Sequence, residues 1–200
     1  KSTIGKVLNV LYRHLDLDDR EPYGPSTFLG VLIAENDALR ERLQEIKSLL
    51  VATPDRQGAS FQALRAELMK RFRDLRAFDA HYVKKENLLF PLLERTWKCY
   101  RPLKVMWSLH NDIRNSIGRI QRLLRSDDVT WQDLKEPIGD YFFLAMGMIH
   151  KEERIVFPAA QDTVSAAEWE ELQRQSFEYP FPYITVPPAP PRTRAAPVLT

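Results

Sequence analysis

The sequence predicts an all-α protein, built as an up-down-up-down four-helix bundle with a short N-terminal helix and an extra C-terminal helix. Glycine is scarce, with 7 in 200 residues. Long stretches place apolar residues at the helical period, and alternating runs of β-branched residues are missing. Four long helical segments with short connections make the bundle the economical architecture.

Three regions follow one another along the chain. Residues 1–25 form an accessory helix and linker, and residues 26–179 form the bundle. Residues 180–200 hold 7 of the 14 prolines and therefore form a proline-rich tail that cannot propagate a helix. We expect this tail to act as a linker, with a ligand for a proline-recognising partner as the alternative.

Start and stop signals delimit the bundle helices. The first is expected over residues 26–51, and the second from Ser60, as its N-cap, to the region of Pro91. The third spans 102–126. The fourth starts in a capping box of Thr130 and Asp133 and runs beyond residue 150, and the last, over 165–179, begins with a box of its own.

The composition excludes several classes of protein. Hydrophobic residues make up 44% and charged residues 28%, typical of a globular domain with a substantial core. The net charge of +2 gives no footprint for nucleic acid. The single cysteine excludes an internal disulfide and favours the cytoplasm. No apolar run reaches the length of a membrane span, which leaves peripheral association open.

A repeated segment carries the functional signal: KENLLFP at 85–91 and EERIVFP at 152–158. On a helical wheel of 100° per residue, Glu86 and Glu153 project within about 30° and about 20° of their apolar stripes. In the second segment this stripe includes Ile138, Phe142 and Met146. A desolvated carboxylate takes up a proton or finds a cation, so the partner is a metal, a histidine, an arginine or a proton.

Histidines supply possible partners. His110 lies about 45° from the centre of the third helix's stripe. His150 and Glu153 have the i, i+3 spacing of ligands in carboxylate-bridged iron bundles. His81 and Glu86 are five residues apart, about 140° on a helix, so they share one ion only if the helix distorts.

A metal-free arrangement explains the same pattern. Arg114, one turn after His110, could reach Glu86 or Glu153 and neutralise the carboxylates in a buried network. Asn36 falls near the inner face of the first helix, and the Tyr82 hydroxyl could support a site. No catalytic residues are predicted, because neither Ser/His/Asp chemistry nor a phosphate loop is indicated, and whether the protein is an enzyme stays open.

The segments HYVKKENLLFPLLE, VMWSLHNDIR and HKEERIVFP together resemble the hemerythrin-like (HHE cation-binding) domains over about residues 26–179. They look closest to a bacterial subgroup with paired KEN/KEE and Phe-Pro motifs. The resemblance implies a four-helix bundle whose interior His and Asp/Glu ligands bind non-haem iron, commonly two ions, for dioxygen binding, storage or sensing.

The sequence departs from that pattern. The first helix offers Glu35 and Asn36 where sites with two irons use a histidine, the third helix has one histidine where oxygen carriers use two, and position 154 is arginine. One ion, two, or none therefore stay open. The expected metal ligands are His81, Glu86, His110, His150 and Glu153, with Asn36, Tyr82 and Arg114 around them.

Two functions follow. The first is a domain that binds a metal, iron before zinc or manganese, and with it dioxygen or another small diatomic, for oxygen, redox or metal sensing. The alternative is a metal-free helical interaction or signalling module with a buried Glu/His/Arg network and a protein partner or a second copy. A small oxidase or peroxidase ranks below both.

Overall fold

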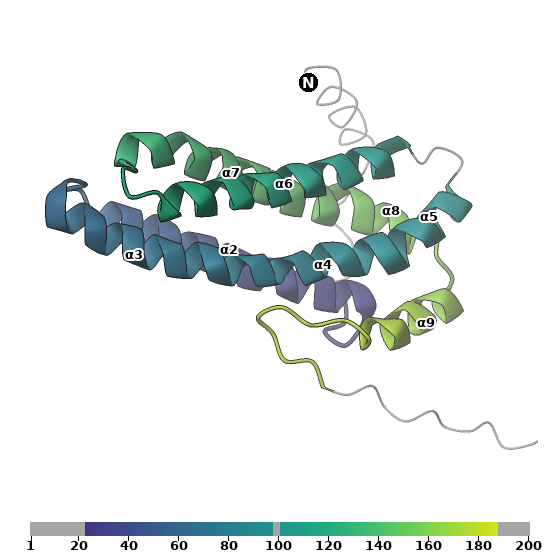
Figure 1. Cartoon of the computed structure of the whole chain (residues 1–200). Coiled ribbons are helices and arrows are strands. Elements are labelled where there is room, and N and C mark those ends of the chain that lie inside the picture. Colours follow the sequence, from purple (N-terminus) through teal and green to yellow (C-terminus); the bar gives the residue numbers. More distant parts are fainter. Residues whose placement is uncertain (1–22, 98–100, 188–200) are drawn as a thin grey trace, which may run out of the picture.

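A computed structural model describes residues 23–97 and 101–187, and within these ranges the protein is all-helical, as predicted (Figure 1). The expected N-terminal helix and most of the tail lie outside these residues. The helices are α2 (Phe28–Ala52), α3 (Gly58–Asp74), η1 (Leu75–Phe78), α4 (Asp79–Lys84), η2 (Lys85–Leu89), α5 (Phe90–Thr96), α6 (Arg101–Arg125), α7 (Trp131–Lys151), η3 (Glu152–Val156), α8 (Phe157–Gln161) and α9 (Ala166–Ser176).

The bundle consists of four helical columns. Figure 1 shows α6 and α7 lying over α2 and α3, with α9 beneath the end that carries α5. The second column runs without a break from α3 through η1, α4 and η2 into α5, and the fourth from α7 through η3 into α8. The bundle architecture is confirmed, and the second and fourth helices continue past their prolines.

The two columns share one distortion. Each Phe-Pro follows a π-helical turn, η2 before Pro91 and η3 before Pro158. A proline inside a helix lacks an N–H donor, and its ring crowds the carbonyl group four residues earlier. A π-helical turn widens the helix by one residue and relieves this crowding, so the repeated sequence produces a repeated bulge.

The predicted capping boxes are present. Thr130 pairs with Asp133 at the start of α7, and Ser165 pairs with Glu168 at the start of α9. The second column begins at Gly58 instead of Ser60. Gly58 has φ of +50°, which glycine adopts without steric cost, and the N-cap is Gln57, three residues earlier than the expected cap Ser60.

The inner face of α7 differs from the expected stripe. Ile138 and Tyr141 are buried, whereas Phe142 is half-buried and Met146 is 42% exposed. The expected stripe was drawn through residues on both sides of η3, and one extra residue in that turn rotates the later positions by about 100°. The stripe was therefore displaced by about one residue.

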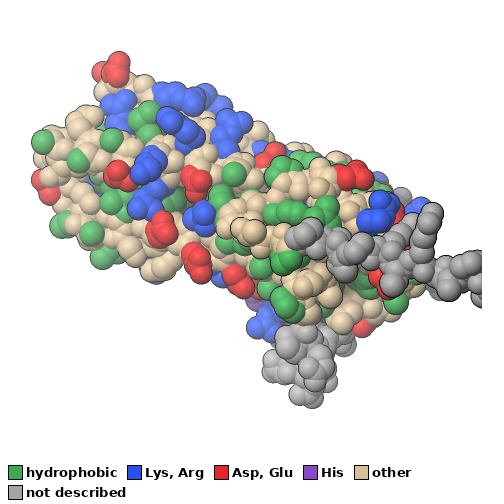
Figure 2. Space-filling view, turned by 90° about the horizontal axis from the view of Figure 1, so that it is seen from below, with side chains coloured by type: hydrophobic (Ala, Val, Ile, Leu, Met, Phe, Trp, Pro, Cys, Tyr) green, Lys and Arg blue, Asp and Glu red, His purple; other side chains and the backbone are tan. Residues whose placement is uncertain are grey.

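On the face that Figure 2 shows, Lys and Arg side chains gather toward one edge of the bundle, and Asp and Glu side chains lie mostly beside and below them. In the part of the chain that the structure describes, no helix combines the length and apolar character needed to cross a membrane.

Candidate functional site

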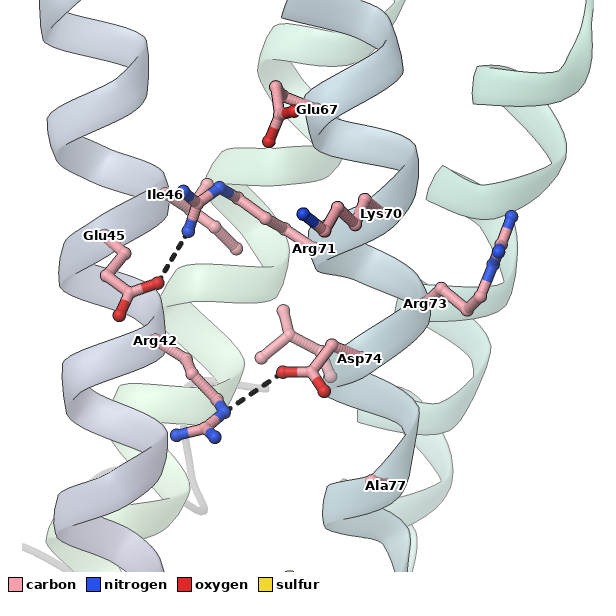
Figure 3. A pocket seen from close by; sticks show the side chains of 10 residues that line it. Arg42, Glu45, Ile46, Glu67, Lys70, Arg71, Arg73, Asp74 and Ala77 are labelled. Atoms are coloured by element: carbon pink, nitrogen blue, oxygen red, sulfur yellow. Dashed lines mark hydrogen bonds and ion pairs between the residues drawn. The ribbon is translucent and has the colours of Figure 1, made fainter. Parts of the chain in front are cut away.

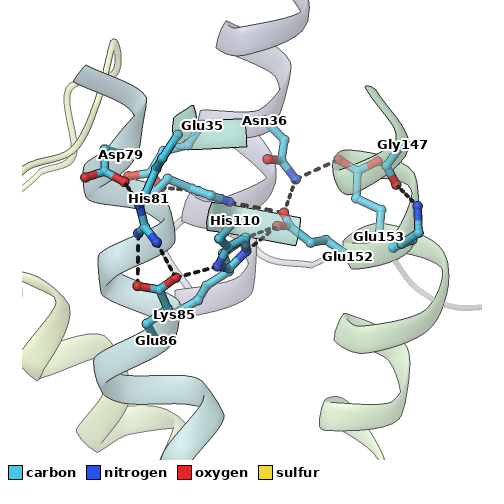
Figure 4. Close-up of polar contacts among 12 residues, drawn as sticks. Glu35, Asn36, Asp79, His81, Lys85, Glu86, His110, Gly147, Glu152 and Glu153 are labelled. Carbon is cyan, nitrogen blue, oxygen red and sulfur yellow. Dashed lines mark hydrogen bonds and ion pairs between the residues drawn. The ribbon is translucent and has the colours of Figure 1, made fainter. Parts of the chain in front are cut away.

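Ionisable side chains gather inside the bundle where the π-helical turns face α2 and α6 (Figure 4). They come from five elements, and we call them the core charge network. Its members are Glu35, Asn36 and Arg40 of α2, His81 and Lys84 of α4, Lys85 and Glu86 of η2, His110 and Arg114 of α6, and Glu152 and Glu153 of η3.

The centre of the network is an ion pair between the two repeated segments. Lys85 is the first residue of KENLLFP and Glu152 the first of EERIVFP, and the Lys85 ammonium donates to Glu152 Oε1. The side chains are 0% and 1% exposed. Burial lowers the pKa of Lys85 well below its ordinary value, although the charges of Glu35 and Glu86 oppose this shift. The first positions of the two repeated segments therefore face each other and carry opposite charges, Lys85 in one and Glu152 in the other.

A second buried pair lies beside the first. Lys84 Nζ donates to Glu35 Oε1 at 2.5 Å, and both side chains are fully buried. Burial raises the pKa of Glu35 to about 7, although the neighbouring Lys84 charge lowers it. Burial also lowers the pKa of Lys84, so each partner is shifted toward its neutral form.

His81 joins the two pairs. Its Nδ1 lies 2.7 Å from Glu35 Oε2 and its Nε2 lies 3.1 Å from Glu152 Oε2. Burial, followed by the charges of the neighbouring lysines, lowers the pKa of His81 well below its ordinary value. His81 therefore links the Glu35 and Glu152 carboxyl groups through its two ring nitrogens.

Glu86 is neutralised from α6. Arg114 donates to its two oxygens at 3.0 and 2.9 Å, and His110 Nδ1 lies 2.7 Å from Oε1. Burial alone would raise the pKa of Glu86, but the hydrogen bonds from His110 and Arg114 lower it overall. The contact expected between Arg114 and Glu86 is therefore present. Burial lowers the pKa of His110 to about 3.

Glu153 of η3 occupies the position that Glu86 occupies in η2, and it is neutralised from α2. Arg40 donates to its Oε2, and Asn36 Nδ2 donates to Oε1 at 3.2 Å and to Glu152 Oε2 at 3.1 Å. Asn36 and Arg40 are one turn apart on α2, as His110 and Arg114 are on α6. The network therefore has an approximate internal two-fold repeat.

Three expected site residues lie differently from the prediction. Glu152, not Glu153, faces the centre, and Glu153 is 20% exposed, because of the register shift described for η3. His150 is exposed on α7, since two residues before Glu152 correspond to about 200° around the helix. Tyr82 is buried as expected, but it contacts the network with its ring, which stacks on His110 with ring centroids 4.4 Å apart.

Lys84 and Lys85 were not among the residues predicted from the sequence. Lysines are almost never fully buried unless they are paired, so two adjacent lysines beside a predicted site indicate a solvent-exposed face. The available signal was the alignment of the repeat, which places Lys85 opposite Glu152.

A separate groove of about 560 Å³ lies on the surface between α2 and α3 (Figure 3). Ion pairs cross it: Arg71 Nη1 lies 2.6 Å from Glu45 Oε2, and Arg42 Nε lies 3.0 Å from Asp74 Oδ2. No member of the core charge network lines it. The network is therefore an interior feature and not the wall of this groove.

Comparison with known families identifies the class of protein. The family model of the Hemerythrin HHE cation binding domain matches residues 27–160, more than half of the chain, and the chain belongs to this family. A search of curated proteins finds no match.

The residues of the network, as arranged, do not fit a resident metal ion. Within residues 23–97 and 101–187, no three His, Cys, Asp or Glu side chains are grouped so that they could hold one. The ammonium groups of Lys84 and Lys85 occupy the positions beside Glu35 and Glu152 where a cation would act. One feature points the other way: His110 Nε2 is buried without a hydrogen-bond partner, 3.9 Å from Glu152 Oε1. The metal-ligand roles expected from the sequence stay predictions.

Proposed function

We propose that this domain is a metal-independent helical interaction or signalling module of the hemerythrin family. In it, two lysines supply the positive charge that a metal would supply elsewhere. The observation that carries the proposal is the Lys85–Glu152 pair at the centre of the bundle, fully buried and joining the two repeated segments.

The charges of the network support this proposal. The four carboxylates are Glu35, Glu86, Glu152 and Glu153, and each is bonded to one cationic side chain, respectively Lys84, Arg114, Lys85 and Arg40. A divalent ion added to this set would leave about two uncompensated positive charges in the interior unless the lysines lost protons or withdrew. The interior is thus balanced by the chain's own side chains.

Interaction fits this interior better than turnover. Buried charge pairs contribute little net stability compared with apolar residues, and their best-attested use is to specify one packing arrangement. No member of the network lines the groove between α2 and α3, so this groove gives a substrate no access to the network. We further propose a cytoplasmic location, from the cysteine usage, and a protein partner or a second copy of the chain.

Iron binding for dioxygen or redox sensing is the second candidate. The cation-binding family and the unpartnered His110 Nε2 favour it. It requires Lys85 to release Glu152. As part of this second candidate, we propose that the chain is most similar to the bacterial subgroup with paired KEN/KEE and Phe-Pro motifs.

Metal analysis separates the two candidates. The purified chain is incubated anaerobically with Fe(II), desalted and analysed for iron, with Zn(II) and Mn(II) in parallel. We expect far less than one ion per chain and a thermal midpoint that neither the metal nor a chelator changes, because a ligand stabilises a fold only if it binds the folded state. Near-stoichiometric iron that is lost in Glu152→Ala and kept in the exposed control Glu178→Ala would contradict the proposal and favour iron binding.

A further inference from the structure

The chain after the family's matched segment folds back onto the bundle. The match ends at residue 160, whereas α9 spans Ala166–Ser176 and contacts both α2 and η2. Figure 1 shows the chain after α9 turning back beneath α4. We call residues 177–187 the strap.

The first anchor of the strap covers the core charge network. The ring of Phe181 lies 4.2 Å from Lys84 Nζ, and Phe177 packs edge-on against Phe181 with ring centroids 5.3 Å apart. A cation over an aromatic face is attracted by the ring quadrupole, most strongly where water is excluded. Lys84 is fully buried, and Phe181 lies on it from outside the matched domain.

The second anchor is Tyr183. Its ring stacks on Phe78 at 6.1 Å, the guanidinium of Arg42 lies 3.6 Å from its centroid, and its hydroxyl donates to the Asp74 carbonyl at 2.9 Å. Phe78 in turn stacks on His81 at 4.5 Å. Tyr183 therefore reaches the network through one intervening ring.

The backbone at this anchor is strained. Tyr183 has φ of +69°, in the left-handed region that non-glycine residues adopt at a cost. Such a conformation persists only where surrounding contacts over-determine it, and here those contacts come from Arg42, Asp74 and Phe78. Without these contacts, nothing would offset the cost of this conformation, and we expect the strap to leave it.

We propose that the face formed by Arg42, Asp74, Phe78 and Lys84 is a docking site for an aromatic-proline-aromatic peptide. Residues Phe181–Tyr183 occupy it in cis, and their displacement uncovers the Lys84–Glu35 pair. The inference deepens the proposed interaction function, because it names the surface where a partner sequence of this chemistry would compete. A tethered segment has a high effective concentration, so the strap blocks the site against free peptides.

The full chain carrying Phe181→Ala and Tyr183→Ala tests the proposal. Limited acetylation followed by peptide mass spectrometry gives the modification rate of Lys84 relative to the exposed Lys135. We expect this ratio to rise about tenfold or more in the double variant, because local opening governs access to a buried group. Thr185→Ala, an exposed position of the strap, is the matched control and should leave the ratio unchanged.

A peptide added in trans gives the second readout. A fluorescent peptide of residues 177–187 should bind the double variant and not the wild-type chain, whose site is filled. The same peptide with alanine at both aromatic positions should bind neither chain. Equal binding to wild type and variant, or an unchanged Lys84 ratio in a folded variant, would overturn the proposal.

A milder variant covers the case in which the double variant fails to fold. Tyr183→Phe keeps the ring and loses only the hydrogen bond to Asp74, so Lys84 should show a smaller rise in acetylation, and no rise would overturn the proposal. The metal experiment is independent of these readouts. Iron binding would contradict the proposed metal independence without changing the acetylation or peptide results. Unchanged Lys84 acetylation in all strap variants would contradict only the docking inference.

Discussion

Replacing Lys85 with methionine removes the cation from the centre of the network while keeping an unbranched side chain of similar length. Glu152 would then remain buried, at 1% exposure, with His81 and Asn36 as its hydrogen-bond partners. Breaking a buried ion pair by removing one partner costs about 3 to 5 kcal/mol. Because two partners remain, we expect the lower end, about 3 kcal/mol.

Equilibrium unfolding in urea at pH 7, followed by circular dichroism, measures this loss. The corresponding fall in thermal midpoint is about 6 to 12 °C for a chain of this length. Lys135→Met, at an exposed position of α7, is the matched control and should leave the midpoint unchanged.

A double-mutant cycle tests whether the loss arises from the pair. Removing both charges of a buried pair is often nearly neutral. Lys85→Met combined with Glu152→Gln should therefore recover at least about 1 kcal/mol of the single variant's loss. A loss below about 1 kcal/mol in Lys85→Met, the scale of a surface salt bridge, would show that the pair does not stabilise the interior, as would strict additivity in the cycle.

Four further substitutions have defined outcomes. Gly30→Ala would place a Cβ 2.0 Å from a backbone oxygen and should cost about 1 to 3 kcal/mol in urea unfolding, whereas Gly139→Ala, with open space around it, should stabilise by about 0.5 to 1 kcal/mol. Arg114→Met strips the bidentate partner from Glu86 and should cost about 2 kcal/mol, less than Lys85→Met because Arg114 is 28% exposed, measured in the same urea titration. The pKa of Glu35 is raised from 4.5 to about 7, so the folded state binds more protons than the unfolded state in that window, and its contribution to stability is present below pH 4.5 and lost as the pH rises through 7. Unfolding free energies of wild type and Glu35→Gln, compared across this range, should show the wild type losing ground as the pH rises, and a constant difference would contradict the shift.

The fold could be predicted because its signals are local. Helical periodicity and scarce glycine define the helices, and capping boxes fix two of their starts, Thr130 with Asp133 and Ser165 with Glu168. The π-helical turns could not be obtained from the same arithmetic. A wheel of constant 100° steps has no place for an inserted residue, so it turned Glu153 inward where the structure has Glu152.

The composition of the site was only partly predictable. Glu86 and His110 were named from their positions on inner faces, Arg114 from its spacing to His110, and His81 from the resemblance to the family. All four belong to the network. The central lysines were passed over because burial of an ammonium depends on a carboxylate from a distant segment, and such a pairing is decided by tertiary packing. Residues 180–187 of the strap were predicted to be part of a linker because of their prolines. Tyr183 nevertheless contacts the Arg42 and Phe78 side chains and the Asp74 carbonyl, all more than a hundred residues earlier, and composition does not encode such a pairing.

The most direct test of whether lysines replace a metal ion is anomalous diffraction at the iron absorption edge. It uses crystals of the full chain soaked anaerobically with Fe(II). We expect no anomalous peak in the bundle interior and the Lys85 ammonium on the Glu152 carboxylate. An anomalous peak bonded to Glu152 and His110, with the Lys85 side chain turned away, would contradict this expectation.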